Sequence, residues 1–209
     1  MVKVGDIMNN SPNYNIPNIY NQFLPAENIC ECIVDFLFNS PNAKNFWKLL
    51  YYTERDCLYK PDLTDAQKAN MICKDPTIDG ATATKNIIFQ KDIDDGFTLN
   101  IPQVRFYTGD FTPINDYSGA IEILVEIVVP NKLSSGIITD KTQVGDRAYL
   151  IGKEIQRNIT HDIIPNCGAN SLIFMNKSAP GGVGNGNGWW RVVANKNYSG
   201  YFLCFSILC

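Results

Sequence analysis

Apolar residues recur every three or four positions in the first part of the chain and at alternate positions in much of the rest. The first pattern predicts helices at about 27–38, 41–55 and 65–72. Ser40 and Thr64 precede the second and third segments, where a hydroxyl side chain favours a helix start. The helix at 41–55 contains Phe46, Trp47, Leu49, Leu50 and Tyr51, so we expect it to pack against another element.

From about residue 84 the alternating pattern predicts strands. Two short ones are expected at 85–90 and 97–101. A long antiparallel hairpin is expected from 103–111 and 120–129, joined by a turn at 113–119.

The second arm of this hairpin has two different faces. One face is apolar, and we expect it to be buried: Ile121, Ile123, Val125, Ile127 and Val129. The other is half polar: Glu122, Leu124, Glu126 and Val128. Arg105, on the first arm, is predicted to form a cross-strand pair with these glutamates, worth at most about 1 kcal/mol.

The remainder of the chain predicts a connection, a helix and three strands. The polar stretch 132–144 is expected to be a mobile connection, and 145–159 an amphipathic helix. Strands are expected at 171–176, 188–193 and 200–208. On the helix we expect the sheet to cover Ala148, Ile151, Ile155 and Ile159, and the remaining faces to carry Arg147, Lys153, Glu154, Gln156 and Arg157.

These elements define an α+β fold: a helical N-terminal part and a mixed, mainly antiparallel sheet with a long β-hairpin and one packed helix. We divide the chain into an extended arm at 1–26, a helical segment at 27–84 and an α+β domain at 85–209. The arm is rich in Asn and Pro, which disfavour helices. The arm either lies on a neighbouring subunit, where its apolar residues would anchor it, or is free in solvent. These apolar residues include Tyr14, Ile16, Tyr20 and Phe23.

Composition and charge argue against several classes of function. The 209 residues carry a net charge of −3 and are 45% hydrophobic but only 19% charged, which argues against a protein that wraps nucleic acid through clustered basic residues. No apolar run reaches the roughly 20 residues of a membrane span, and the first ten residues lack a signal-peptide pattern, so we expect neither membrane nor export. The seven cysteines lack paired CxxC spacing and are expected to be reduced and mostly packed.

The candidates for chemistry are few, and we expect no cofactor or metal. His161 is the only histidine, and a place at a helix end explains it better than catalysis does. The aspartates before Gly96 do not match the spacing of a calcium loop. The glycine-rich loop at 178–187 is followed by a strand instead of the helix that a phosphate loop requires.

Trp189 and Trp190 follow that loop on a predicted strand, so they are expected to face opposite sides of the sheet. An outward tryptophan could stack on a base or sugar, but without a basic groove we favour a subunit contact.

The order of elements in about half of the chain resembles a known class. The long hairpin, the helix opening with Asp146-Arg147-Ala148 and the last strand around 200–207 are similar to head-to-tail joining and tail-completion (neck) proteins of tailed bacteriophages. Residues 1–100 have no counterpart in that class. The resemblance implies identical copies in a homo-oligomeric ring on the virion axis, contacting the portal and other neck or tail proteins and leaving a channel for DNA.

We therefore expect a non-enzymatic structural protein of the virion neck or tail, assembled in the host cytoplasm, with its function in its interfaces. One alternative is a carbohydrate- or receptor-binding module of a tail or head fibre. Another is a small hydrolase or nuclease centred on His161. The residues we predict at subunit interfaces are Tyr14, Ile16, Tyr20, Phe23, Arg105, Tyr107, Glu122, Glu126, Trp189 and Trp190.

Overall fold

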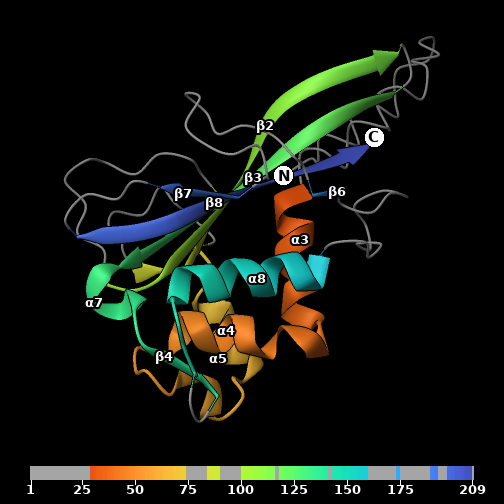
Figure 1. Cartoon of the computed structure of the whole chain (residues 1–209). Coiled ribbons are helices and arrows are strands. Elements are labelled where there is room, and N and C mark those ends of the chain that lie inside the picture. The colour runs from red at the N-terminus through yellow and green to blue at the C-terminus, as the bar shows by residue number, and fades with distance from the viewer. Residues whose placement is uncertain are drawn as a thin grey trace.

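A computed structural model shows one mixed sheet with helices stacked against one of its faces (Figure 1). The structure describes residues 29–73, 84–89, 100–115, 118–140, 143–159, 173–174, 189–192 and 197–208. This confirms the predicted α+β class. No helix within these ranges is both long and apolar enough to cross a membrane.

The helices belong to two groups along the chain. The first comprises α3 (Ile29–Asn39), the 3-10 turn η1 (Pro41–Ala43), α4 (Lys44–Tyr51), the 3-10 turn η2 (Cys57–Tyr59) and α5 (Asp65–Asn70). The second comprises the short α7 (Asn131–Ser134) and the long α8 (Arg147–Ile159). In Figure 1, α8 lies between the sheet and α4.

The main sheet has the strand order β1-β2-β3-β8-β6, and β7 also pairs with β8. Its strands are β1 (Ile87–Ile88), β2 (Gln103–Asn115), β3 (Ser118–Pro130), β6 (Ile173–Phe174), β7 (Trp189–Val192) and β8 (Tyr198–Leu208). Among the strand pairs that the structure describes in this sheet, only β1–β2 is parallel, so the sheet is mixed but mainly antiparallel. A separate two-stranded sheet is formed by β4 (Ile137–Asp140) and β5 (Gln143–Gly145).

Two helix starts follow the sequence pattern. The Ser40 side chain accepts a hydrogen bond from the Asn42 amide, and Pro41 is the first helical residue. The Thr64 hydroxyl accepts from the Gln67 amide while the Gln67 side chain accepts from the Thr64 amide, which makes a capping box. These predicted caps are confirmed.

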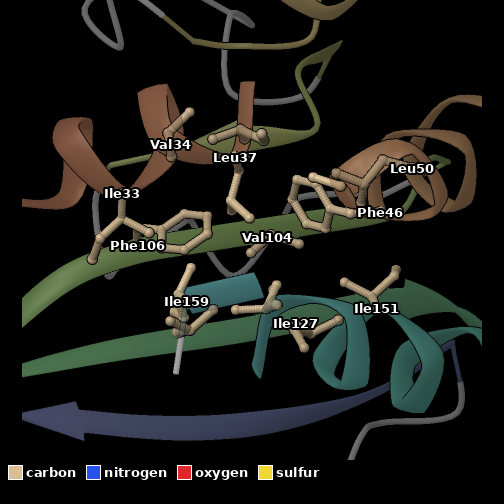
Figure 2. Close-up of a cluster of buried hydrophobic side chains, with 14 of the residues drawn as sticks. Ile33, Val34, Leu37, Phe46, Leu50, Val104, Phe106, Ile127, Ile151 and Ile159 are labelled. Atoms are coloured by element: carbon tan, nitrogen blue, oxygen red, sulfur yellow. The ribbon is translucent and has the colours of Figure 1, made fainter. Parts of the chain in front are cut away.

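The predicted apolar face of the hairpin is confirmed. Its five residues on β3 are buried, Ile121 being 4% exposed and the other four 0%. They form one continuous core with residues of β2 and of the helices. Figure 2 shows part of this core, with α3 contributing Ile33, Val34 and Leu37, α4 contributing Phe46 and Leu50, β2 contributing Val104 and Phe106, β3 contributing Ile127, and α8 contributing Ile151 and Ile159. The helices of 27–84 and the strands of 85–209 therefore share a core.

Several predicted boundaries are wrong. The second helix ends at Tyr51 and not near residue 55, because Tyr52 is extended and the following carbonyls bond to Arg147. The predicted turn at 113–119 is mostly strand, since β2 runs to Asn115 and β3 begins at Ser118. Asn100 and Ile101 are not in a strand, and the rest of the strand predicted at 97–101 lies outside the described residues.

The mobile connection predicted at 132–144 is also wrong. The segment contains α7 and the β4–β5 hairpin. Ile137 is fully buried, and the Ile138 amide donates to the Arg55 carbonyl at 2.9 Å. The polar composition of this segment gave no sign that Ile137 is buried or that the Ile138 amide bonds to a distant part of the chain.

Candidate functional site

The four predicted interface residues on the hairpin lie together. Arg105, Tyr107, Glu122 and Glu126 occupy one face of β2 and β3, opposite the face formed by Val104, Phe106 and Val125 that enters the core. We call this the second face of the sheet. It is formed by Gln103, Arg105, Tyr107, Glu122, Leu124, Glu126, Val128, Phe202, Cys204 and Ser206.

An ion pair stands at the centre of the second face. Arg105 and Glu126 are directly opposed, and Arg105 Nη1 donates to Glu126 Oε2 at 2.8 Å. Arg105 Nε donates to Gln103 Oε1 at 3.2 Å, and Gln103 Nε2 donates to the Lys85 carbonyl at 3.0 Å. The predicted cross-strand pair is confirmed, and its side chains are only 12% and 13% exposed. Removing one partner would therefore leave a charge that water barely reaches.

Apolar side chains surround this pair. Leu124 lies between Tyr107 on β2 and Cys204 on β8, while Phe202 is opposite Glu126. Cys204 is fully buried, and Tyr107, Leu124 and Phe202 are half-buried. The second face is thus less open to solvent than its alternating polar pattern indicated.

The remaining predicted interface residues are only partly described. Tyr14, Ile16, Tyr20 and Phe23 lie outside the described residues. The backbones of Trp189 and Trp190 form part of β7, where they pair with Leu203 and Phe202 of β8. The histidine at 161, the glycine-rich loop at 178–187 and the aspartates before Gly96 lie outside the described residues as well.

Among the hairpin residues whose burial the structure describes, the exposed ones lie in the far half of β2. A strand of 13 residues extends about 44 Å, whereas the 13-residue helix α8 is about 20 Å long. Figure 1 shows β2 and β3 continuing well past the helices. Thr108, Gly109, Asp110 and Thr112 are exposed. The sheet therefore presents a length of strand that the helical layer does not cover.

A β-bulge marks the start of this exposed half. Thr108 pairs with Ile123 and Phe111 with Ile121, so two residues of β2, Gly109 and Asp110, lie opposite Glu122 of β3. A bulge bends its strand and increases the local twist. Here it also brings two carboxylates, those of Asp110 and Glu122, to the same level of the hairpin.

Arg147, which the sequence pattern assigned to the solvent side of its helix, is fully buried. Its Nε donates to the Leu133 carbonyl, Nη1 to the carbonyls of Leu49 and Tyr52, and Nη2 to those of Thr53 and Glu54, at 2.5–3.0 Å. All five N–H groups of the guanidinium are thus used. Burial lowers the pKa of Arg147, and the carbonyls beyond the end of α4 offset its charge. This cluster ties the N-terminal helices to α8.

Glu154 was also predicted on the solvent side of α8, and this is wrong, since it is only 8% exposed. Burial raises its pKa, and Arg157 opposes that rise from 2.8 Å away. Asn158 next to it donates to the Glu154 carbonyl and accepts from the Ser40 hydroxyl. These contacts are internal to the packing of α8 on the N-terminal helices.

A serine–aspartate chain near α8 has a structural explanation. Ser199 donates to Ser134 at 2.7 Å, and Ser134 donates to Asp146 Oδ2 at 2.6 Å. The other oxygen of Asp146 accepts from the Tyr149 amide at 2.8 Å, which caps the start of α8. One oxygen of Asp146 is thus engaged by Ser134 and the other by the Tyr149 amide, so the cap of α8 accounts for this arrangement.

Two cavities in the described part of the chain are small. One, of about 130 Å³, lies beside Phe38, Trp47 and Asp62, and its Lys44 is paired with Asp62 at 2.7 Å. The other, of about 260 Å³, lies between Val34, Ile72 and Phe89. Ligand pockets usually measure about 300–1,000 Å³. The described residues also contain no group of three or more His, Cys, Asp or Glu placed to hold a metal ion.

Compared with known proteins, the chain matches no family model, no curated protein and no solved structure.

Proposed function

We propose that this chain is a structural, non-enzymatic ring protein of the head-to-tail connector of a tailed bacteriophage. Copies would form a homo-oligomeric ring in the neck or tail of the virion, join the portal to the tail, and leave a channel for DNA. The ring would assemble in the host cytoplasm.

The observation that carries the proposal is the hairpin of β2 and β3, whose far part extends past the helices; we call it the overhanging hairpin. The fold itself uses the first half of β2, where β1 pairs with it and its apolar residues enter the core. In the far half of β2, Thr108, Gly109, Asp110 and Thr112 are exposed, and the strand extends past the helices (Figure 1). An exposed strand invites pairing with other chains unless something covers it, and proteins that assemble in rings have a use for such a strand.

Two further features support the proposal. The structure contains a long hairpin, then an amphipathic helix, then a last strand that pairs with the hairpin, and this is the order of elements on which the resemblance to neck proteins rests. The net charge of −3 suits a channel through which DNA has to pass without binding.

The test is the mass of the purified chain measured by light scattering over a range of concentrations, followed by electron microscopy of any large species. We expect closed rings of uniform copy number, formed by the chain alone or on addition of a portal ring. A monomer that neither self-associates nor binds a portal or tail-tube ring would contradict the proposal. Binding of a trimer to a glycan array would favour the fibre module instead.

A further inference from the structure

The solvent side of α8 carries a short row of aromatic and basic residues. Tyr149, Lys153 and Arg157 follow one another at intervals of four, so they share one face of the helix. All three are exposed, Tyr149 by 49%. The sheet and the N-terminal helices cover the other sides of α8.

This row differs in charge from the rest of the helix. Arg147 and Glu154 are buried, so the charges that α8 presents to solvent are those of Lys153 and Arg157. Arg157 is held by Glu154 and by the Asn42 carbonyl, yet its side chain remains 54% exposed. Tyr149 packs edge-on against Tyr201 of β8, with ring centroids 6.1 Å apart, and is thereby fixed in position.

The part of the hairpin that extends past the helices carries negative charge, opposite to that of the row on α8. From Phe106 to Val125 the sequence contains no Lys or Arg. Its strands contribute Asp110, which is exposed, and Glu122, which is half-buried, at the level of the bulge. Figure 1 shows this part of the hairpin rising away from α8, so the two charged surfaces point to different regions of the molecule.

We propose that the bulge region of the hairpin in one copy docks on the Tyr149–Lys153–Arg157 row of α8 in the next copy. The inference rests on the proposed ring, because it names the contact between neighbouring subunits. Two different surfaces of the same chain that complement each other make a head-to-tail contact, and such a contact closes into a ring when the rotation between copies allows it.

Charge and dimensions both favour a second copy as the occupant. An acidic strand meets a basic helix face, which steers association and sets the register of the contact. The strand from Thr108 to Asn115 extends about 27 Å, which is enough to cross the roughly 12 Å from Tyr149 to Arg157. Because both surfaces are exposed to solvent, the attraction is expected to weaken with salt.

The experiment is a charge exchange measured by sedimentation velocity at low and high salt. We expect Asp110→Lys and Lys153→Glu each to weaken self-association by about tenfold or more, since each places like charges together. The chain with both changes, or an equimolar mixture of the two single variants, should recover association. Both positions are exposed, so melting temperatures should stay close to that of the unchanged chain.

Two controls isolate the contact. Asp35→Lys makes the same change of net charge at an exposed position on α3 and should leave association unchanged. Asp110→Asn and Lys153→Gln remove charge without reversing it and should have smaller effects in the same direction.

The outcomes separate the two proposals. Rings that form equally well with either single reversal, or reversals that the double change does not rescue, would overturn this contact and leave the ring itself standing. A chain that stays monomeric under all conditions, with or without a portal ring, would overturn both.

Discussion

The two halves of strand β2 differ in how deeply their described residues are buried. In its first half, Val104 and Phe106 are fully buried, β1 pairs on one side and β3 on the other. In its second half, Thr108, Asp110 and Thr112 are exposed, and a bulge interrupts the pairing with β3. The first half is held by the same contacts that define the fold. The second half adds exposed residues beyond those contacts, which is why we propose a role in assembly for it.

The largest expected difference between the two halves comes from adding a charge. Val125→Asp places a carboxylate opposite Phe106 in the core and should cost about 5 kcal/mol or more, enough to prevent folding. Thr112→Asp adds the same group to the exposed half and should change stability by no more than about 0.5 kcal/mol. Circular dichroism and urea unfolding measure both. A soluble Val125→Asp chain that unfolds cooperatively would show that the buried face is misassigned.

The next effect concerns the Arg147 cluster, which joins α8 to the N-terminal helices. Arg147→Met removes the donors to five carbonyls and should lower the free energy of unfolding by about 3–5 kcal/mol. Arg147→Lys keeps the charge but loses the planar fork, so it should recover only part of the loss. Urea midpoints compare the three chains. Equal stability of the Met variant and the unchanged chain would mean that this cluster does not join the helical groups.

A smaller effect is expected at the ion pair on the second face. Glu126→Ala leaves Arg105 with Gln103 but without a carboxylate, which should cost about 1–3 kcal/mol. The double change Arg105→Met with Glu126→Leu should be less destabilising than Glu126→Ala alone, because no buried charge is left without its partner. A double-mutant cycle measures the coupling, and additive effects of the single changes would contradict it.

The smallest effect is a pH dependence far from the hairpin. Hydrogen bonds from Lys44 and then Lys48 lower the pKa of Asp62 from 3.8 to about 2. A lowered carboxyl pKa means that its stabilisation is complete above pH 4 and is lost as the pH falls towards 2. Asp62→Asn should therefore flatten the acid limb of the stability curve, as followed by melting temperature between these values. An unchanged slope would count against the paired lysines as the cause.

Glu154 acts in the opposite direction. Because burial raises its pKa, the folded state binds its proton more tightly than the unfolded chain does, and stability from this group falls as the pH rises above the ordinary glutamate value.

The pattern of the sequence was sufficient for the parts of the fold that depend on local rules. Alternation along β3 identified the buried face, and register across the hairpin placed Arg105 opposite Glu126. The side chains of Ser40 and Thr64 accept hydrogen bonds from backbone amides only two or three residues further along the chain, so these helix starts were predictable.

The parts that could not be predicted depend on distant contacts. Arg147 has the sequence context of an exposed first-turn residue, and its burial comes from carbonyls more than 90 positions earlier in the chain. Gly136 adopts a φ of 80° beside Arg55, and the strand that follows it is held by an Arg55 carbonyl. The basic character of the row on α8 could not be predicted either, because Glu154 lies between Lys153 and Arg157 in the sequence and its burial depends on tertiary packing.

The central claim is that the first half of β2 serves the fold and the second half serves assembly. The molar mass of a chain with a shortened hairpin tests it most directly. Residues 109–122, which include the bulge with Asp110 and Glu122, would be replaced by Asn-Gly, which favours a tight turn between the paired residues Thr108 and Ile123. The account predicts a folded chain with cooperative unfolding whose mass in solution is that of a monomer, under conditions in which the intact chain forms rings. A shortened chain that still forms rings of the same mass would contradict it.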